Sequence, residues 1–179
     1  DEEREKNSER ESMFLVAQFA QEFFKESLWE GTEGKAIGLT YFKERGFSEK
    51  TIEDFGLGYS PSSISALSNA AKKGSHSLEF LEKTGLLIHN EERQQHIDRF
   101  RGRVIFPIRS LSGRVQGFGG RILNKEAKTA KYLNSPESDI YHKSKVLYGL
   151  FEAKKTIAKE DCCYLVEGYT DVIQMHQAG

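Results

Sequence analysis

The segment Val104-Ile-Phe-Pro-Ile-Arg-Ser-Leu-Ser-Gly-Arg-Val-Gln-Gly-Phe118 contains two β-favouring runs separated by a turn signal. Residues 104–108 and 115–118 are predicted strands, and Ser112-Gly113 predicts the turn that joins them. Because Pro107 has no backbone N–H, the first strand is predicted to lie at a sheet edge or to carry a bulge. The middle of the chain therefore predicts a small antiparallel β region.

The first hundred residues are predicted to form a mainly helical scaffold. Apolar residues at 13, 16, 17, 20 and 24 have the spacing of one helix face, which predicts a buried helix starting near Met13. Shorter helices are predicted at about 35–45, 48–54, 63–73 and 77–83, and a glycine follows most of them. Residues 1–10, almost all charged or polar, are predicted to be a linker, and residues 91–98 a loop.

A second structural unit is expected near residue 160. A short extended piece at 131–136 and a helix at about 144–159 precede it. Residues 162–166 are predicted to be a strand and residues 170–177 a helix. Because one strand and one helix cannot bury themselves alone, we expect the sequence to run into a second domain here. The predicted fold class is α+β.

Composition limits the class of protein. The 179 residues are 37% hydrophobic and 30% charged, which is enough apolar material for a core. No apolar run is long enough for a membrane span, and the acidic start does not resemble a signal peptide, so a cytoplasmic protein is expected. Cys162 and Cys163 are adjacent, which disfavours a disulfide between them, and we expect both to be reduced strand residues. Scattered histidines and the absence of a CxxC pair predict no structural zinc site in the chain.

Charge is unevenly distributed along the chain. Residues 99–145 hold 11 Lys/Arg and 3 Asp/Glu, a net charge of +8, which leaves 15 Lys/Arg and 24 Asp/Glu elsewhere, a net charge of −9. A basic segment inside a nearly neutral protein favours a polyanionic partner. A solvated basic surface without a partner is the alternative.

The stretch Tyr164-Leu-Val-Glu-Gly-Tyr-Thr-Asp171 places a carboxylate and a glycine at the end of the predicted strand. An acid there, beside bare backbone, can hold a divalent ion and the phosphate bound to it. A carboxylate metal site next to a cationic segment is what phosphoryl transfer on nucleic acid requires. Two ordinary explanations stay open: Glu167 as a polar residue that closes a strand, and Asp171 as an acid favoured by the helix dipole.

Several segments in the same order resemble the RNA polymerase domain of bacterial DnaG-type DNA primases. The resemblance covers about residues 11–179. The segments that carry it are Tyr41-Phe-Lys-Glu-Arg-Gly46, Phe55-Gly-Leu-Gly-Tyr59, Arg99-Phe-Arg-Gly-Arg-Val-Ile-Phe-Pro-Ile108, Gly113-Arg-Val-Gln-Gly-Phe-Gly-Gly-Arg121, Lys131-Tyr-Leu-Asn-Ser-Pro136, Lys143, Leu147-Tyr-Gly149 and Glu167-Gly-Tyr-Thr-Asp171.

The resemblance implies a domain plan and a site. Residues 11–159 would be the amino-terminal subdomain of the polymerase domain, and residues 160–179 the first strand–helix unit of a truncated TOPRIM α/β subdomain. Glu167 would be catalytic and would bind metal together with Asp171. The residues expected to bind template or nucleotide are Arg101, Arg103, Arg121, Lys131, Tyr132, Asn134 and Lys143. Arginine and lysine suit phosphate and an aromatic ring suits base stacking, although Tyr132 can equally serve packing.

The implied activity is synthesis of short RNA primers during DNA replication. The cofactor would be Mg²⁺ or Mn²⁺, and Zn²⁺ would belong only to an amino-terminal domain whose ligands are missing here. The implied partners are single-stranded DNA, ribonucleoside triphosphates, an RNA–DNA hybrid and, through a missing C-terminal region, the replicative helicase. Further acidic motifs would follow residue 179, so we expect this chain to be inactive alone. We also expect it to be monomeric. The alternatives are another TOPRIM enzyme, such as a topoisomerase or nuclease, and a non-catalytic single-stranded-DNA-binding module.

Overall fold

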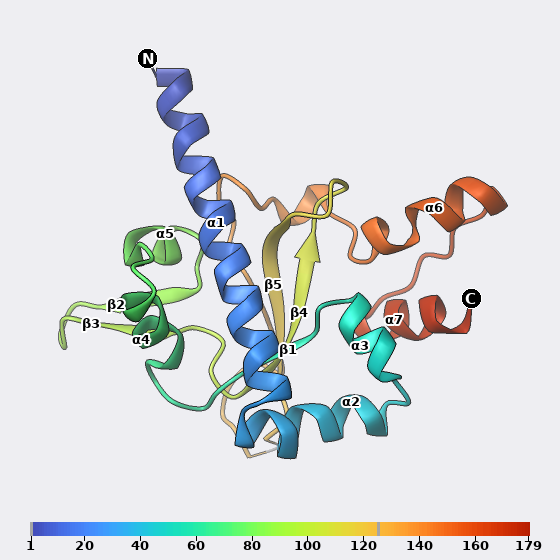
Figure 1. The fold of residues 1–179 in the computed structure, drawn as a ribbon, viewed down its shortest axis with the longest axis horizontal. Coiled ribbons are helices and arrows are strands. Elements are labelled where there is room, and N and C mark those ends of the chain that lie inside the picture. The colour runs from blue at the N-terminus through green and yellow to red at the C-terminus, as the bar shows by residue number, and fades with distance from the viewer. Residues whose placement is uncertain (1, 125) are drawn as a thin grey trace.

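A computed structural model describes residues 2–124 and 126–179 (Figure 1). Its helices are α1 (Glu2–Trp29), η1 (Gly34–Leu39), α2 (Thr40–Glu44), α3 (Glu49–Asp54), α4 (Ala66–Lys73), α5 (Leu78–Lys83), η2 (Lys143–Lys145), α6 (Leu150–Glu160) and α7 (Tyr169–Ala178). Its strands are β1 (Gly58–Ser60), β2 (Leu87–Asn90), β3 (Gln95–Asp98), β4 (Arg103–Arg109), β5 (Val115–Ile122) and β6 (Tyr132–Asn134). The predicted α+β class is confirmed.

An antiparallel sheet in the order β1-β4-β5-β6 forms the centre of the fold. β4 and β5 are the predicted hairpin, and Gly113 in their turn has φ +89°. β1 pairs with β4 only as far as Ile105, so Pro107 lies where β4 has a neighbour on one side alone. A register shift follows between Ile108 and Arg109. The prediction made from the missing N–H of Pro107 is confirmed.

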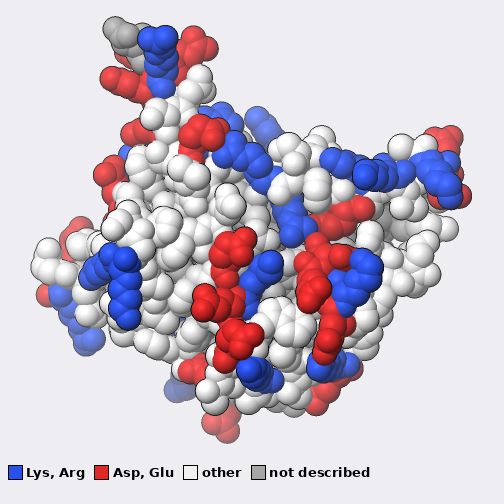
Figure 2. All heavy atoms as spheres, viewed as in Figure 1, with Lys and Arg blue, Asp and Glu red and all other residues white. Residues whose placement is uncertain are grey.

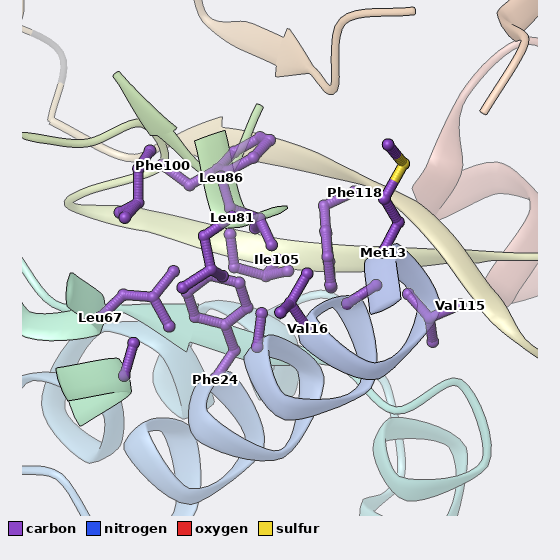
Figure 3. Close-up of a cluster of buried hydrophobic side chains, with 14 of the residues drawn as sticks. Met13, Val16, Phe24, Leu67, Leu81, Leu86, Phe100, Ile105, Val115 and Phe118 are labelled. Atoms are coloured by element: carbon purple, nitrogen blue, oxygen red, sulfur yellow. The ribbon is translucent and has the colours of Figure 1, made fainter. Parts of the chain in front are cut away.

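The two faces of the sheet build two cores, because successive strand residues point to opposite sides. Ile105 and Phe118 face α1, which crosses this side of the sheet in Figure 1. Figure 3 shows Val16 and Phe24 of α1 meeting them together with Leu81 of α5. Val104 and Phe106 face the other way, into a cluster that includes Leu28, Phe42, Phe47, Ile52, Phe55, Leu57, Tyr59 and Ile173.

Capping serines and terminating glycines predicted most helix ends correctly. Ser48 accepts the N–H of Thr51 at 3.1 Å and starts α3, and Ser77 accepts the N–H of Phe80 at 3.4 Å and starts α5. Gly46, with φ +79°, ends the helical segment before it, as predicted. No described helix combines the length and the hydropathy needed to cross a lipid bilayer.

Two predictions about local structure in the first hundred residues were wrong. Residues 2–10, expected to be a linker, are exposed but helical, so α1 begins well before Met13. Charged residues with good helix propensity, and acids in the first turn, allow this extension. Residues 91–98, expected to be a loop, contribute β3, which pairs with β2 in a separate hairpin.

The predicted strand at 162–166 is also absent. These residues have no regular structure, Cys162 and Cys163 are exposed, and Leu165 is 81% exposed. A strand needs neighbouring backbone groups for its hydrogen bonds, and β1 to β6 pair elsewhere. The cysteines are therefore accessible thiols rather than buried strand residues. α7, predicted at 170–177, is confirmed.

The carboxylate of Asp98 caps α4 from outside the helix. Asp98 is buried, and its oxygens accept the N–H of Leu67 at 2.6 Å and of Ser68 at 3.2 Å, whereas Ser65 at the cap position makes no side-chain cap. Burial raises the pKa of the Asp98 carboxyl, against the opposing effect of these donors. The bonds join β3 to the start of α4.

We therefore expect Asp98→Ala to lower the free energy of unfolding by about 1–3 kcal/mol, because two buried donors lose their acceptor. Urea denaturation followed by circular dichroism measures the change. Asp139→Ala removes an exposed acid and serves as the control. Equal stability of the two variants would contradict the capping role.

Candidate nucleic-acid and metal site

The sheet face opposite α1 carries a group of polar aromatic and basic side chains at its β5–β6 edge. Arg121 pairs with Tyr132 across the two strands, and Gly119 pairs with Asn134. Residues two apart on a strand share a face, so these positions lie on one surface. Tyr41, Lys131 and Tyr169 lie beside them. We call the group the β5–β6 patch; its members are Tyr41, Arg121, Lys131, Tyr132, Asn134 and Tyr169.

The guanidinium of Arg121 lies between two tyrosine rings. Its central carbon is 4.9 Å from the ring centre of Tyr41 and 5.7 Å from that of Tyr132, and Nη1 donates to the Tyr41 hydroxyl. Burial raises the pKa of Tyr41 despite the opposing charges of Arg121 and Arg45, so its hydroxyl stays neutral. Nε of Arg121 is buried and has no partner among the described residues. The arginine is thus held by aromatic rings and not by an acid.

A hollow of about 640 Å³ opens beside the patch. Thr40, Tyr41 and Glu44 line it from the α2 side, and Arg121 and Lys131 line it from β5 and from the residue before β6. The hollow is large enough for a nucleotide base or a phosphate group.

Tyr169, the first residue of α7, anchors that helix to the sheet. Its ring stacks on Phe106 at 5.0 Å between centres, and its hydroxyl donates to Oδ1 of Asn134 at 2.6 Å. A Cβ on Gly119 would lie 2.5 Å from this ring, so only glycine permits the approach. Burial raises the pKa of Tyr169.

The opposite end of α7 is tied to the segment between α2 and α3. The amide of Gln177 donates to the carbonyl of Gly46 at 2.8 Å and accepts the N–H of Ser48 at 2.9 Å. Ile173 is fully buried between the two ends. α7 is therefore fixed at both ends, which sets the position of the acid that precedes it.

Glu167 and Asp171 sit at the start of α7. Glu167 is exposed and forms no ion pair with another described residue. Asp171 is exposed too, and Oδ2 accepts the N–H of Gly168 at 3.1 Å, which is a helix cap. No third acid, histidine or cysteine of the described residues joins them in a metal-sized cluster. Mg²⁺ binds carboxylate oxygens, usually keeps several waters and takes further ligands from substrate phosphates. The exposed Glu167 carboxylate fits such an ion, whereas the Asp171 carboxylate already accepts the Gly168 N–H.

Arg103 is not at the surface. It is 3% exposed, and it donates to the carbonyls of Gly120, Ala130 and Lys131 and to the hydroxyl of Thr129. Its guanidinium thus holds the segment 129–131, which leads into β6, by hydrogen bonds. The part of the structure that is described gives it no route to a ligand.

The rest of the basic segment is divided between structural and free cations. Arg109 pairs with Glu152 at 2.7 Å, and Arg114 pairs with Glu11 at 2.8 Å. Arg101 and Lys143 are exposed, and neither lines the hollow beside the β5–β6 patch. Figure 2 shows one face of the molecule on which Lys/Arg and Asp/Glu are intermixed, without a continuous basic area. Acids thus pair with part of the basic segment, and on this face, the α1 side, its cations form no single basic area.

The sequence analysis assigned no role to Tyr41 or Tyr169, which the structure brings to the patch. Tyr41 comes from α2, eighty positions before Arg121, and no short motif could have linked them. For Tyr169 a signal existed: the glycine-rich run 117–120 left room on β5 for a large ring.

Comparisons with known proteins agree on one family. Residues 23–154 match the family described as DNA primase catalytic core, N-terminal domain. The DNA primase of Halalkalibacterium halodurans is 43% identical over 97% of this chain, and the chain spans 28% of that protein.

Solved structures of the same fold include the RNA polymerase domain of Mycobacterium tuberculosis primase DnaG in complex with double-stranded DNA. Its TM-score is 0.88 at 36% identity, over 95% of this chain and 53% of that one. The DnaG primase catalytic domain bound to single-stranded DNA has a TM-score of 0.82 at 37% identity, over 96% of this chain and 54% of that one.

The contact between Gly119 and Tyr169 gives a stability prediction. Gly119→Ala should lower the free energy of unfolding by about 1–3 kcal/mol, because the new methyl group overlaps the ring. Urea denaturation measures this in two backgrounds, wild type and Tyr169→Ala. The cost should largely disappear when the ring is absent. The same cost in both backgrounds would mean that Gly119 matters for a reason other than this contact.

Proposed function

The chain belongs to the bacterial DnaG-type DNA primase family, and on that premise we propose that it is part of a catalytic core that makes RNA primers on single-stranded DNA. The chain spans 28% of a curated relative, so the activity belongs to a longer protein. The observation that carries the proposal is the β5–β6 patch. It holds the unpaired cation Arg121, and its members Asn134 and Tyr169 connect it to α7, the helix that follows Glu167.

The patch suits a nucleic-acid backbone or a triphosphate. Arg121 and Lys131 form no ion pair with a described acid, so their charges are available to phosphate. Tyr132 is 41% exposed beside them, which suits stacking on a base. Asn134 is already engaged by Tyr169, so it positions that ring and α7. Arg101 and Lys143 would provide further exposed cations for the template. Arg103 would support the segment that leads into β6 through its hydrogen bonds to backbone carbonyls.

Glu167 and Asp171 would hold Mg²⁺ or Mn²⁺, together with acids that follow residue 179. When bound, such ions activate the attacking hydroxyl and stabilise the leaving pyrophosphate. Glu167 supplies an exposed carboxylate at a fixed place, because Tyr169 and Gln177 immobilise α7. Gly168 leaves the neighbouring backbone open to phosphate.

Other parts of the proposal concern the longer protein. Residues 11–159 would be the amino-terminal subdomain and residues 160–179 the start of the TOPRIM subdomain, whose further strands would pair with residues 162–166. Its substrates would be ribonucleoside triphosphates, its product an RNA–DNA hybrid and its location the cytoplasm. A zinc-binding domain and a helicase-binding region would flank the catalytic core.

Replacing the two free cations tests the nucleic-acid interface. Arg121→Ala with Lys131→Ala should weaken binding of a single-stranded DNA oligonucleotide roughly tenfold. The slope of log affinity against log salt should fall by about 1.4, because two phosphate contacts are lost. Fluorescence anisotropy at several salt concentrations measures both quantities.

Lys72→Ala with Lys73→Ala is the matched control, since it removes the same charge from α4 on the other side of the sheet. Equal losses of DNA affinity in the two double variants would mean that only the overall charge of the protein matters, and not the β5–β6 patch.

The metal role is tested in the longer protein. Glu167→Gln should lower the rate of primer synthesis roughly 100-fold while DNA affinity stays within about twofold. Primer yield with labelled ribonucleotides and anisotropy measure the two properties. Unchanged primer yield would remove Glu167 from catalysis and would favour the non-catalytic binding module.

A further inference from the structure

Three potential metal ligands converge on the lobe formed by α5 and the β2–β3 hairpin. The ligand atoms of Glu82, His89 and His96 all lie within 4.8 Å of one another, and these residues form the metal-sized cluster found among the described residues. Nε2 of His96 is 3.4 Å from Oε2 of Glu82, and the two imidazole ring centres are 5.2 Å apart.

The fold builds this cluster from three separate elements. His89 of β2 and His96 of β3 are directly opposite in the hairpin register, so both rings leave the same face. Leu87 and Asp98, two residues away on each strand, are buried on that face against α5 and α4. Glu82 follows the buried Leu81 on α5, which brings its carboxylate beside the imidazoles.

No lysine or arginine of the described residues pairs with Glu82. The next residue, Lys83, is occupied by Glu79 at 3.0 Å and by Glu9 at 3.2 Å. The side chains remain accessible: Glu82 is 47% exposed and His96 is 21% exposed. An ion from solvent can therefore reach the cluster without opening the core.

We propose that Glu82, His89 and His96 bind a divalent transition-metal ion of the zinc type, with water at the remaining coordination position. Two imidazoles and one carboxylate are ligands that Zn²⁺ takes in sites with three protein ligands. Metal–ligand bonds of about 2.0–2.2 Å put tetrahedral ligand atoms roughly 3.4 Å apart. The pair His96–Glu82 already has this separation, and the ligand atom of His89 lies within 4.8 Å of both.

The ion would join α5 to both strands of the hairpin. Because the ligands come from three elements, binding favours the folded arrangement of this lobe over any opened one. This site uses different residues from those proposed for Mg²⁺. The sequence predicted no structural zinc site, because its histidines are scattered along the chain. The β2–β3 hairpin brings two of them together.

Isothermal titration calorimetry with ZnCl₂ tests the proposal on the 179-residue chain at about pH 7.5, where imidazole is neutral. The parent carries Cys162→Ser and Cys163→Ser, because these exposed thiols would bind zinc themselves. We expect one bound ion per chain, and saturating ZnCl₂ should raise the melting temperature by roughly 3 °C or more.

His89→Ala, His96→Ala and Glu82→Gln, each in that background, should weaken zinc binding roughly tenfold or more and remove the thermal shift. His142→Ala is the control, because His142 also lies beside an acid, Glu137 at 3.0 Å, but has no second imidazole. Its zinc affinity should equal that of the parent. Circular dichroism without zinc verifies that every variant is folded.

Absence of zinc binding in the parent, or equal affinity in the parent and all three ligand variants, would overturn the proposal.

Discussion

The start of α7 is held against the sheet by one close contact, that of the Tyr169 ring with the bare backbone of Gly119. The ring fills the space a side chain on β5 would need, stacks on Phe106 and donates to Asn134 of β6. Without this contact the first turn of α7, which follows Glu167, would lose its link to the sheet. A glycine on β5 thus leaves room for the tyrosine that anchors the helix after Glu167 to the sheet.

Alternation along β4 and β5 explains why this surface is separate from the main core. Ile105 and Phe118 meet α1 on one face, while Phe106 and Gly119 receive Tyr169 on the other. The same alternation divides the basic segment. Arg103 points beneath β6 and is satisfied by backbone carbonyls, whereas Arg121 points to the other side and lies between aromatic rings. The net charge of residues 99–145 is therefore larger than the charge that is accessible to a ligand.

Sequence reasoning predicted the elements with strong local signals. The β4–β5 hairpin, the capped helix α3 and α7 follow from turn residues, caps and periodicity, which act over a few residues. It failed where the structure depends on distant partners. Residues 162–166 have strand-like side chains but no described neighbour to pair with, and β3 looked too polar to be a strand although β2 stabilises it. Tyr41 reached the site only through tertiary packing, which no spacing in the sequence records.

The proposal puts Glu167 and the β5–β6 patch in one site. Its most direct test is a titration of the isotope-labelled chain with a ribonucleoside triphosphate loaded with Mn²⁺, followed by nuclear magnetic resonance. Paramagnetic broadening reports which amides lie near the ion. Our account predicts that signals of residues 168–171 and of residues 119–121 and 132–134 broaden together, while those of α4 stay sharp. Broadening confined to one of these groups, or centred on another part of the molecule, would contradict it.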